Sequence, residues 1–189
     1  MAPHIKIPPD SALLLLDLQQ DFLSDAGKMP VARNHVQPLL EAANAAIAIF
    51  KKAGRPIVAV GNEFRRGDVV MNLLRGNASV EGSPGARWDA RVPIGSAKYL
   101  PKWASDAFVN PELEPWLREH GVKVLAISGL FARACVTATA KSALRRGFKV
   151  YLIEDAIACA SDRSRTRALA RLHGLGALSI FAQVPIVDL

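Results

Sequence analysis

Short, uninterrupted apolar segments alternate along the chain with longer segments of helical periodicity. The apolar segments lie at residues 12–16, 57–60, 122–127, 148–153 and 177–181. Runs of this length are typical of strands buried on both faces, as in a parallel sheet that is covered by helices. A further short strand is expected after the irregular segment 64–98.

The segments between these runs predict helices. Apolar residues recur every three or four positions from Val36 to Phe50, and Gly54 marks the end of that helix. Asn110 and Pro111 predict the start of a second helix, which runs to about His120. Two more helices are expected at 134–146 and 161–173, each followed by glycine.

This order predicts an α/β fold with three α/β/α layers, in which helices cover both faces of an open, mostly parallel six-stranded sheet. We expect one domain over residues 1–189. The segment 64–98 is rich in glycine and proline, and a structureless loop of that length in a compact domain is usually functional or disordered. Trp88 within it is a candidate for a lid or pocket wall.

Composition narrows the class of protein. Half of the 189 residues are apolar, which excludes disorder, collagen and coiled coil. The net charge of +7 comes from scattered lysines and arginines, so we expect a solvated cationic surface and no nucleic-acid partner. Two cysteines form no disulfide framework, and the N-terminal apolar run is too short for a signal peptide or a membrane span. These features predict a cytoplasmic protein without a membrane partner.

Ligands of open α/β sheets bind beyond the carboxyl ends of the strands, and three candidate residues lie there or close by. Cys135 follows a buried strand at the start of a helix, where the helix N-terminus lowers a thiol pKa and supplies N–H groups for an oxyanion. Asp17 ends an apolar run and could accept a proton; Lys102 could stabilise both charges. Taken singly, each has an ordinary alternative: a buried structural cysteine, a loop cap and a solvated lysine. Cys159 has no such context and is expected to be structural.

The contexts of these three residues match one family. LLLLDLQQDF at 13–22, KWASDAF from Lys102 to Phe108, GLFARACVTATAKSA at 129–143 and RRGFKVYLIEDAIA at 145–158 resemble the isochorismatase-like cysteine hydrolases, in particular their amidohydrolase branch. That branch includes nicotinamidases, N-carbamoylsarcosine amidase and lactam hydrolases. The resemblance covers residues 11–181, and three motifs in the right order are far more specific than any one of them.

The resemblance implies an Asp–Lys–Cys triad of Asp17, Lys102 and Cys135. Such enzymes cleave the C–N bond of a small carboxamide, ureide or lactam through a cysteine thioester, without a cofactor. It also implies a cis peptide bond between Leu130 and Phe131, an oxyanion hole formed by the N–H groups of Phe131 and Cys135, and a homo-oligomer, either a dimer or a tetramer.

The substrate-binding candidates are mostly aromatic, which suggests a small, flat or cyclic amide. Gln19 and Phe22 match family positions beside the substrate, whereas the other candidates follow from their place in the chain. These others are Glu63, Phe64, Trp88 and Phe131, with Arg87 or Arg133 nearby.

This chain departs from parts of the family pattern in two ways, one at the position of the nicotinamidase metal ligands and one in having a cysteine that isochorismatases proper typically lack. Nicotinamidases bind a metal through an aspartate and two histidines after the second strand, where this chain has no histidine. Glu63 and Asp68 alone are weak ligands, so we expect no metal. Isochorismatases proper cleave a vinyl ether and typically lack the cysteine, so Cys135 favours C–N hydrolysis over that alternative.

Other classes fit less well. A dinucleotide-binding protein would carry a glycine fingerprint where 17–22 lies. Cys–His catalysis would need a histidine in one of the segments that follow the strands, at 17–22, 62–66 and 129–135, and none of them contains one. A catalytically silent binding protein on the same fold stays open.

Overall fold

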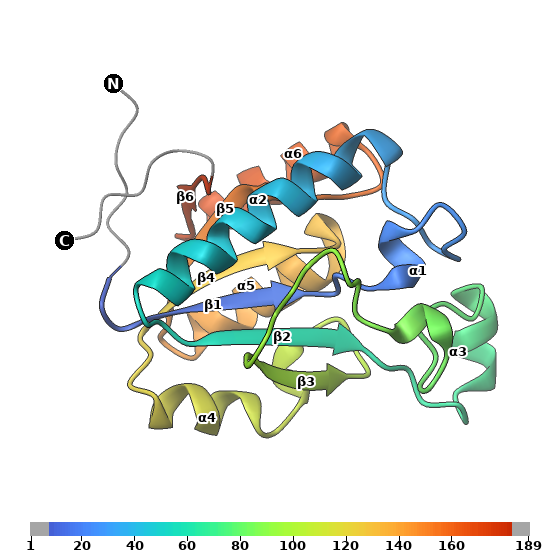
Figure 1. Ribbon diagram of the computed structural model, residues 1–189, viewed down its shortest axis with the longest axis horizontal. Coiled ribbons are helices and arrows are strands. Elements are labelled where there is room, and N and C mark those ends of the chain that lie inside the picture. Colours follow the sequence, from blue (N-terminus) through green and yellow to red (C-terminus); the bar gives the residue numbers. More distant parts are fainter. Residues whose placement is uncertain (1–7, 183–189) are drawn as a thin grey trace.

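The computed structural model describes residues 8–182, and its centre is a parallel sheet of six strands in the order β3-β2-β1-β4-β5-β6 (Figure 1). The strands are β1 Ser11–Leu16, β2 Ile57–Asn62, β3 Lys98–Lys102, β4 Val124–Gly129, β5 Lys149–Ile157 and β6 Leu178–Ile180. The helices are α1 Gln20–Leu23, α2 Arg33–Lys52, α3 Val69–Leu74, α4 Leu113–Glu119, α5 Thr137–Arg145 and α6 Asp162–His173. The expected three-layer α/β fold is confirmed.

Side chains of β1 alternate between two hydrophobic clusters, one on each face of the sheet. Leu14 and Leu16 belong to the cluster that α4, α5 and α6 cover, and Leu13 and Leu15 belong to the cluster under α2. Every residue of β1 is buried. The uninterrupted apolar run therefore reflects a strand with helices on both sides. None of the helices within residues 8–182 is long and apolar enough to span a membrane.

The sheet order places a topological switch point between β1 and β4. From β1 the chain passes to β2 and β3 on one side, and it returns through β4, β5 and β6 on the other. Gly129 ends β4 with φ of 118°, and a Cβ there would lie 2.0 Å from the Leu16 carbonyl oxygen. Only glycine allows the two strand ends to come this close, so the residues that follow β1 and β4 meet here.

Three local expectations were wrong in detail. The helix expected from Pro111 begins at Leu113, because the Asn110 side chain accepts a hydrogen bond from the Glu112 N–H and holds a turn there. The helix expected from Ala134 begins at Thr137, after a π-helical turn. The segment 64–98 is not without structure, since it contains α3 and a short 3₁₀ turn.

Candidate active site

Asp17, Lys102 and Cys135 meet at the carboxyl edge of the sheet. The Lys102 Nζ lies 3.0 Å from an Asp17 carboxylate oxygen and 3.3 Å from the Cys135 sulfur. Asp17 and Lys102 are fully buried, and Cys135 is 6% exposed. Three residues that lie far apart in the sequence therefore form one cluster, as their motifs predicted.

Local backbone geometry brings each side chain to this edge. Asp17 directly follows β1 and has φ of 59°, which turns the chain away from the strand direction. Lys102 is the last residue of β3 and pairs with Asn62 of β2. Cys135 lies in the π-helical turn Ala132–Val136 between β4 and α5, where the Val136 N–H donates to the Phe131 carbonyl five residues earlier. Turns of this kind occur frequently at functional sites.

The pKa of the Cys135 thiol is raised to about 12, chiefly by burial and also by the Asp17 charge, although Lys102 opposes the shift. This corrects the expectation that a helix N-terminus would lower it. Cys135 lies inside a buried turn, where removing the thiolate from water costs more than the neighbouring cation returns. The resting thiol is therefore protonated at neutral pH.

Burial also affects the pKa values of Asp17 and Lys102. Burial raises the pKa of Asp17 in spite of the attraction of Lys102. Burial also opposes the charge on Lys102, but Asp17 and Cys135 outweigh it and raise the lysine pKa. Neither Asp17 oxygen makes a well-aligned hydrogen bond to a described residue, so the carboxylate has lone pairs free to accept a proton. The cluster thus places a cation beside a carboxylate and a protonated thiol.

Asn62 is a fourth polar group in this cluster, and the motifs did not single it out. It is buried at the end of β2, where its Oδ1 accepts a hydrogen bond from the Lys102 Nζ. Its Nδ2 lies 3.9 Å from the Cys135 sulfur. The signal that could have found it is the one that marked Asp17, because it too is a polar residue at the end of an apolar run.

The substrate-binding candidates do not form one group. Glu63 and Trp88 line a cavity of about 450 Å³ together with Arg87 and Tyr99, whose hydroxyl donates to Glu63 at 2.8 Å. Phe64 is buried elsewhere, with the Arg75 guanidinium 3.9 Å from the centre of its ring.

Of the remaining candidates, Phe22 and Phe131 pack against each other, and Gln19 forms hydrogen bonds to the backbone. Phe22 is fully buried and packs edge-on against Phe131 at 5.5 Å, and the Leu130–Phe131 peptide bond is cis. Gln19 is also fully buried, and its amide bonds to the backbone of Asn62 and Ala86. Arg133 is exposed. The contacts of Gln19 are therefore those of a residue that holds the backbone.

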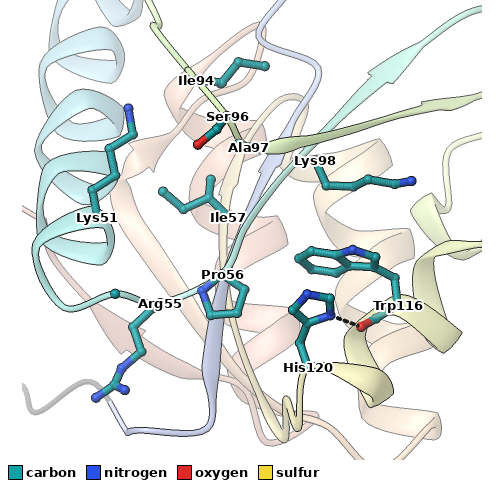
Figure 2. Close-up of a pocket in the computed structure, with 11 residues that line it drawn as sticks. Lys51, Arg55, Pro56, Ile57, Ile94, Ser96, Ala97, Lys98, Trp116 and His120 are labelled. Carbon is teal, nitrogen blue, oxygen red and sulfur yellow. Dashed lines mark hydrogen bonds between the residues drawn. The ribbon is translucent and has the colours of Figure 1, made fainter.

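A second cavity, of about 400 Å³, lies at the amino edge of the sheet, away from the triad. Figure 2 shows Lys51, Arg55 and Lys98 around an apolar floor that includes Pro56 and Ile57. Their charged groups point apart from one another. Trp116 stacks on His120 at 3.9 Å along one wall. No residue predicted for the active site lines this cavity.

The residues present do not fit a zinc ion of the kind that nicotinamidases hold. At the position of the expected ligands, Glu63 accepts a hydrogen bond from Tyr99, and Arg65 lies over the Trp103 ring. Within the described part of the chain, no three histidine, cysteine, aspartate or glutamate side chains gather as metal ligands would.

Comparison with known sequences identifies relatives over most of the chain. A family profile of the isochorismatase domain matches residues 11–183. The isochorismatase family protein YddQ of Bacillus subtilis is 29% identical over 150 residues, which are 78% of this chain and 77% of that protein. A streptothricin hydrolase of Streptomyces noursei is 30% identical over 79% of this chain, which spans 55% of the length of that hydrolase.

Solved structures give the same result for the fold. The pyrazinamidase of Pyrococcus horikoshii in complex with zinc superposes with a TM-score of 0.82 at 29% identity, over 92% of this chain and 99% of that one. The N-carbamoylsarcosine amidase of Thermoplasma acidophilum gives 0.80 at 26% identity, over 92% and 97%. Motifs, fold and sequence similarity agree: the chain belongs to the isochorismatase family of hydrolases.

Proposed function

We propose that this protein hydrolyses the C–N bond of a small carboxamide, ureide or lactam through a thioester on Cys135. One observation carries the proposal: the Lys102 ammonium touches both the Asp17 carboxylate, at 3.0 Å, and the Cys135 sulfur, at 3.3 Å, in a buried site. A nucleophile, a base and a fixed cation are the groups that acyl transfer from nitrogen requires.

The first half-reaction forms the thioester. Asp17 accepts the thiol proton as the Cys135 sulfur attacks the carbonyl carbon, and Lys102 stabilises the negative charge on sulfur. The N–H groups of Phe131 and Cys135 are the proposed donors to the oxyanion. When the tetrahedral intermediate collapses, Asp17 returns its proton to the leaving nitrogen, because an amine leaves poorly without one.

The second half-reaction regenerates the enzyme. Asp17 takes a proton from water, the resulting hydroxide attacks the thioester carbonyl, and the Cys135 sulfur leaves and regains its proton. The products of a carboxamide or ureide are a carboxylic or carbamic acid and an amine or ammonia, whereas a lactam opens to a single product that carries both the acid and the amino group. Lys102 keeps its charge throughout, which its raised pKa supports.

The names of the relatives favour C–N hydrolysis over vinyl-ether cleavage. They include streptothricin hydrolase, maleamate amidohydrolase, ureidoacrylate amidohydrolase and N-carbamoylsarcosine amidase. The cavity that Glu63 and Trp88 line has the size of a small-molecule site, and none of Asp17, Lys102 and Cys135 lines it. Its size supports a small substrate.

The test is a screen of small amides, ureides and lactams for release of ammonia or amine, with a vinyl-ether acid as a further arm. On the best substrate, Cys135→Ala is expected to reduce kcat at least about 10³-fold, and the wild type quenched during turnover should carry an acyl adduct by intact-protein mass spectrometry. Cys159→Ser is the matched control, since Cys159 is also buried but lies outside the cluster. Full turnover by Cys135→Ala would overturn the covalent mechanism, and activity on the vinyl ether alone would favour the alternative reaction.

A further inference from the structure

Asn62 contacts both the cation and the nucleophile of the proposed triad. Its Oδ1 accepts a hydrogen bond from the Lys102 Nζ at 2.5 Å, and its Nδ2 lies 3.9 Å from the Cys135 sulfur. The residue is 3% exposed, so water does not compete for either contact. Asn62 thus bridges the lysine and the cysteine from the end of β2.

The chemistry of its neighbours fixes which way the carboxamide points. An ammonium group has only donors, so the carbonyl oxygen of Asn62 must face Lys102. The amide N–H groups then face the sulfur. A contact between an N–H and a neutral thiol is weak, whereas the same contact to a thiolate is assisted by the charge. The interaction strengthens as the proton leaves, which is the condition for lowering a reaction barrier.

The Gln19 side chain forms two hydrogen bonds with the Asn62 backbone, as the backbone of a neighbouring strand would. The β1–β2 ladder has its last pair at Leu16 and Val60, and the chain turns away at Asp17. Beyond that point the Gln19 side chain donates to the Asn62 carbonyl and accepts from the Asn62 N–H, each at 2.8 Å. The same amide donates to the Ala86 carbonyl at 2.6 Å, in the segment that lines the cavity beside Glu63 and Trp88. It therefore ties one wall of that cavity to the residue that touches the sulfur.

We propose that Asn62 is a further catalytic residue, which stabilises the Cys135 thiolate as Asp17 removes the proton, and that Gln19 is a positioning residue that acts through Asn62. This inference rests on the proposed function and deepens it. It also replaces the expected substrate contact of Gln19, whose side chain is fully buried and already bonded to backbone groups.

The first test needs no substrate, so it is separate from the test of the reaction itself. In a Cys159→Ser background, the rate of Cys135 alkylation by iodoacetamide is measured from about pH 7 to about pH 9, where the thiolate is a small fraction and the rate is proportional to it. Asn62→Ala is expected to lower this rate at each pH, and the isosteric Asn62→Asp to lower it further, because a carboxylate repels the thiolate. If Asn62→Ala does not fold, the alkylation profile of Asn62→Asp alone tests the proposal. An unchanged profile in the folded variants would overturn the proposal.

Asn110→Ala is the matched control, because Asn110 is buried and its amide also bonds backbone groups, but it does not touch the triad. It should lower stability and leave the alkylation profile unchanged. With an amide substrate in hand, Asn62→Ala is expected to lower kcat about 10- to 100-fold, with KM changed less than threefold. A rise in KM with unchanged kcat would instead place Asn62 in ground-state substrate binding.

Gln19 is tested by its coupling to Asn62. Gln19→Ala should shift the thiol profile in the same direction as Asn62→Ala but by less, and the double variant should be no worse than Asn62→Ala alone. Gln19→Glu keeps an acceptor for the Asn62 N–H but cannot donate to the two carbonyls, so partial rescue relative to Gln19→Ala is expected. Additive effects of the two alanine changes would show that Gln19 does not act through Asn62. If the wild type hydrolyses no amide but the profiles shift as stated, the proposed function fails, whereas the stabilisation of the thiolate by Asn62 and the positioning of Asn62 by Gln19 are supported.

Discussion

Strand β3 carries a lysine at each end, and the two lie in opposite environments. Their side chains leave the same face of the strand, four residues apart. Lys102 at the carboxyl edge is fully buried and bonds to Asp17, Asn62 and Cys135. Lys98 at the amino edge is 36% exposed in its side chain and pairs with Glu112, which is 63% exposed.

The difference shows where charge matters in this fold. At the amino edge, beside the cavity of Figure 2, both members of the Lys98–Glu112 pair reach water, so either can lose its partner at little cost. At the carboxyl edge no water screens the charges, so each depends on the others. A buried cluster of this kind is held together by mutual neutralisation and yields reactive groups with shifted pKa values.

The largest effect should follow from replacing the two lysines by methionine in turn. Lys102→Met leaves the Asp17 carboxylate buried without a counter-ion and should lower the free energy of unfolding by about 3–5 kcal/mol. It should also abolish hydrolysis, because no cation remains beside the sulfur. Lys98→Met should change stability by less than about 0.5 kcal/mol and leave turnover unchanged. Urea unfolding and the amide assay measure both.

Adding Asp17→Asn to Lys102→Met makes the comparison sharper. The double variant has no buried charge left unpaired and should recover part of the lost stability without recovering activity. Equal losses of stability from the two single lysine changes would show that burial of Lys102 has no energetic consequence.

The second effect is on stability at alkaline pH. The folded Cys135 thiol has its pKa raised to about 12, whereas an unfolded thiol ionises near pH ~8.5. Between these values the unfolded chain binds fewer protons than the folded one, so stability falls as pH rises. The stability advantage of the wild type over Cys135→Ser should therefore shrink from pH 8 to pH 10, by roughly 1 kcal/mol per pH unit above the unfolded pKa.

Both proteins carry Cys159→Ser, so that one thiol titrates. The measurement is urea unfolding at a series of pH values. A difference that stays constant over this range would mean that the folded thiol ionises as readily as the unfolded one, and a difference that grows would support the lowered pKa that the sequence had suggested.

The contrast between the two edges also marks what the sequence could predict. The central strands were predictable because both of their faces are buried. Such strands require an unbroken apolar run, and the sequence has one at 12–16 and one at 57–60. The convergence of Asp17, Lys102 and Cys135 was predictable because each stands in a recognisable motif. Helix starts were less certain, since the turn at Pro111 and the π-helical turn before α5 depend on particular hydrogen bonds.

What depended on tertiary contacts was missed. The raised pKa of Cys135 reflects burial by residues distant in the sequence, which a local view of a helix N-terminus does not include. Gln19 was predicted to contact the substrate because it matches a family position. In the structure its amide instead forms hydrogen bonds to the backbone of Asn62 and Ala86. Neither partner is near it in the chain.

A smaller effect is expected at Tyr99, the second residue of β3, on the opposite face from both lysines. Its hydroxyl donates to Glu63 at 2.8 Å, and burial is the main cause of a pKa above the usual tyrosine range. Tyr99→Phe removes this bond but keeps the ring packed against Trp88, so stability should fall by about 1 kcal/mol. Tyr151→Phe is the control, because its hydroxyl bonds no other described residue. Equal stability losses in the two variants would show that the bond to Glu63 contributes nothing.

The smallest effect should come from the exposed pair itself, measured by a double-mutant cycle on Lys98 and Glu112. The Nζ–Oε2 distance is 3.1 Å, but both side chains are open to solvent, so a coupling energy of about 0.2–1 kcal/mol is expected at low salt. At 1 M salt the screening length is about 3 Å, and the coupling should vanish. A cycle on Asp17 and Lys102 should give a larger coupling with little dependence on salt, because ions cannot enter between two fully buried groups. If both couplings fell together with salt, the carboxyl-edge cluster would be hydrated, and the raised thiol pKa on which the proposed proton transfer depends would lose its physical cause.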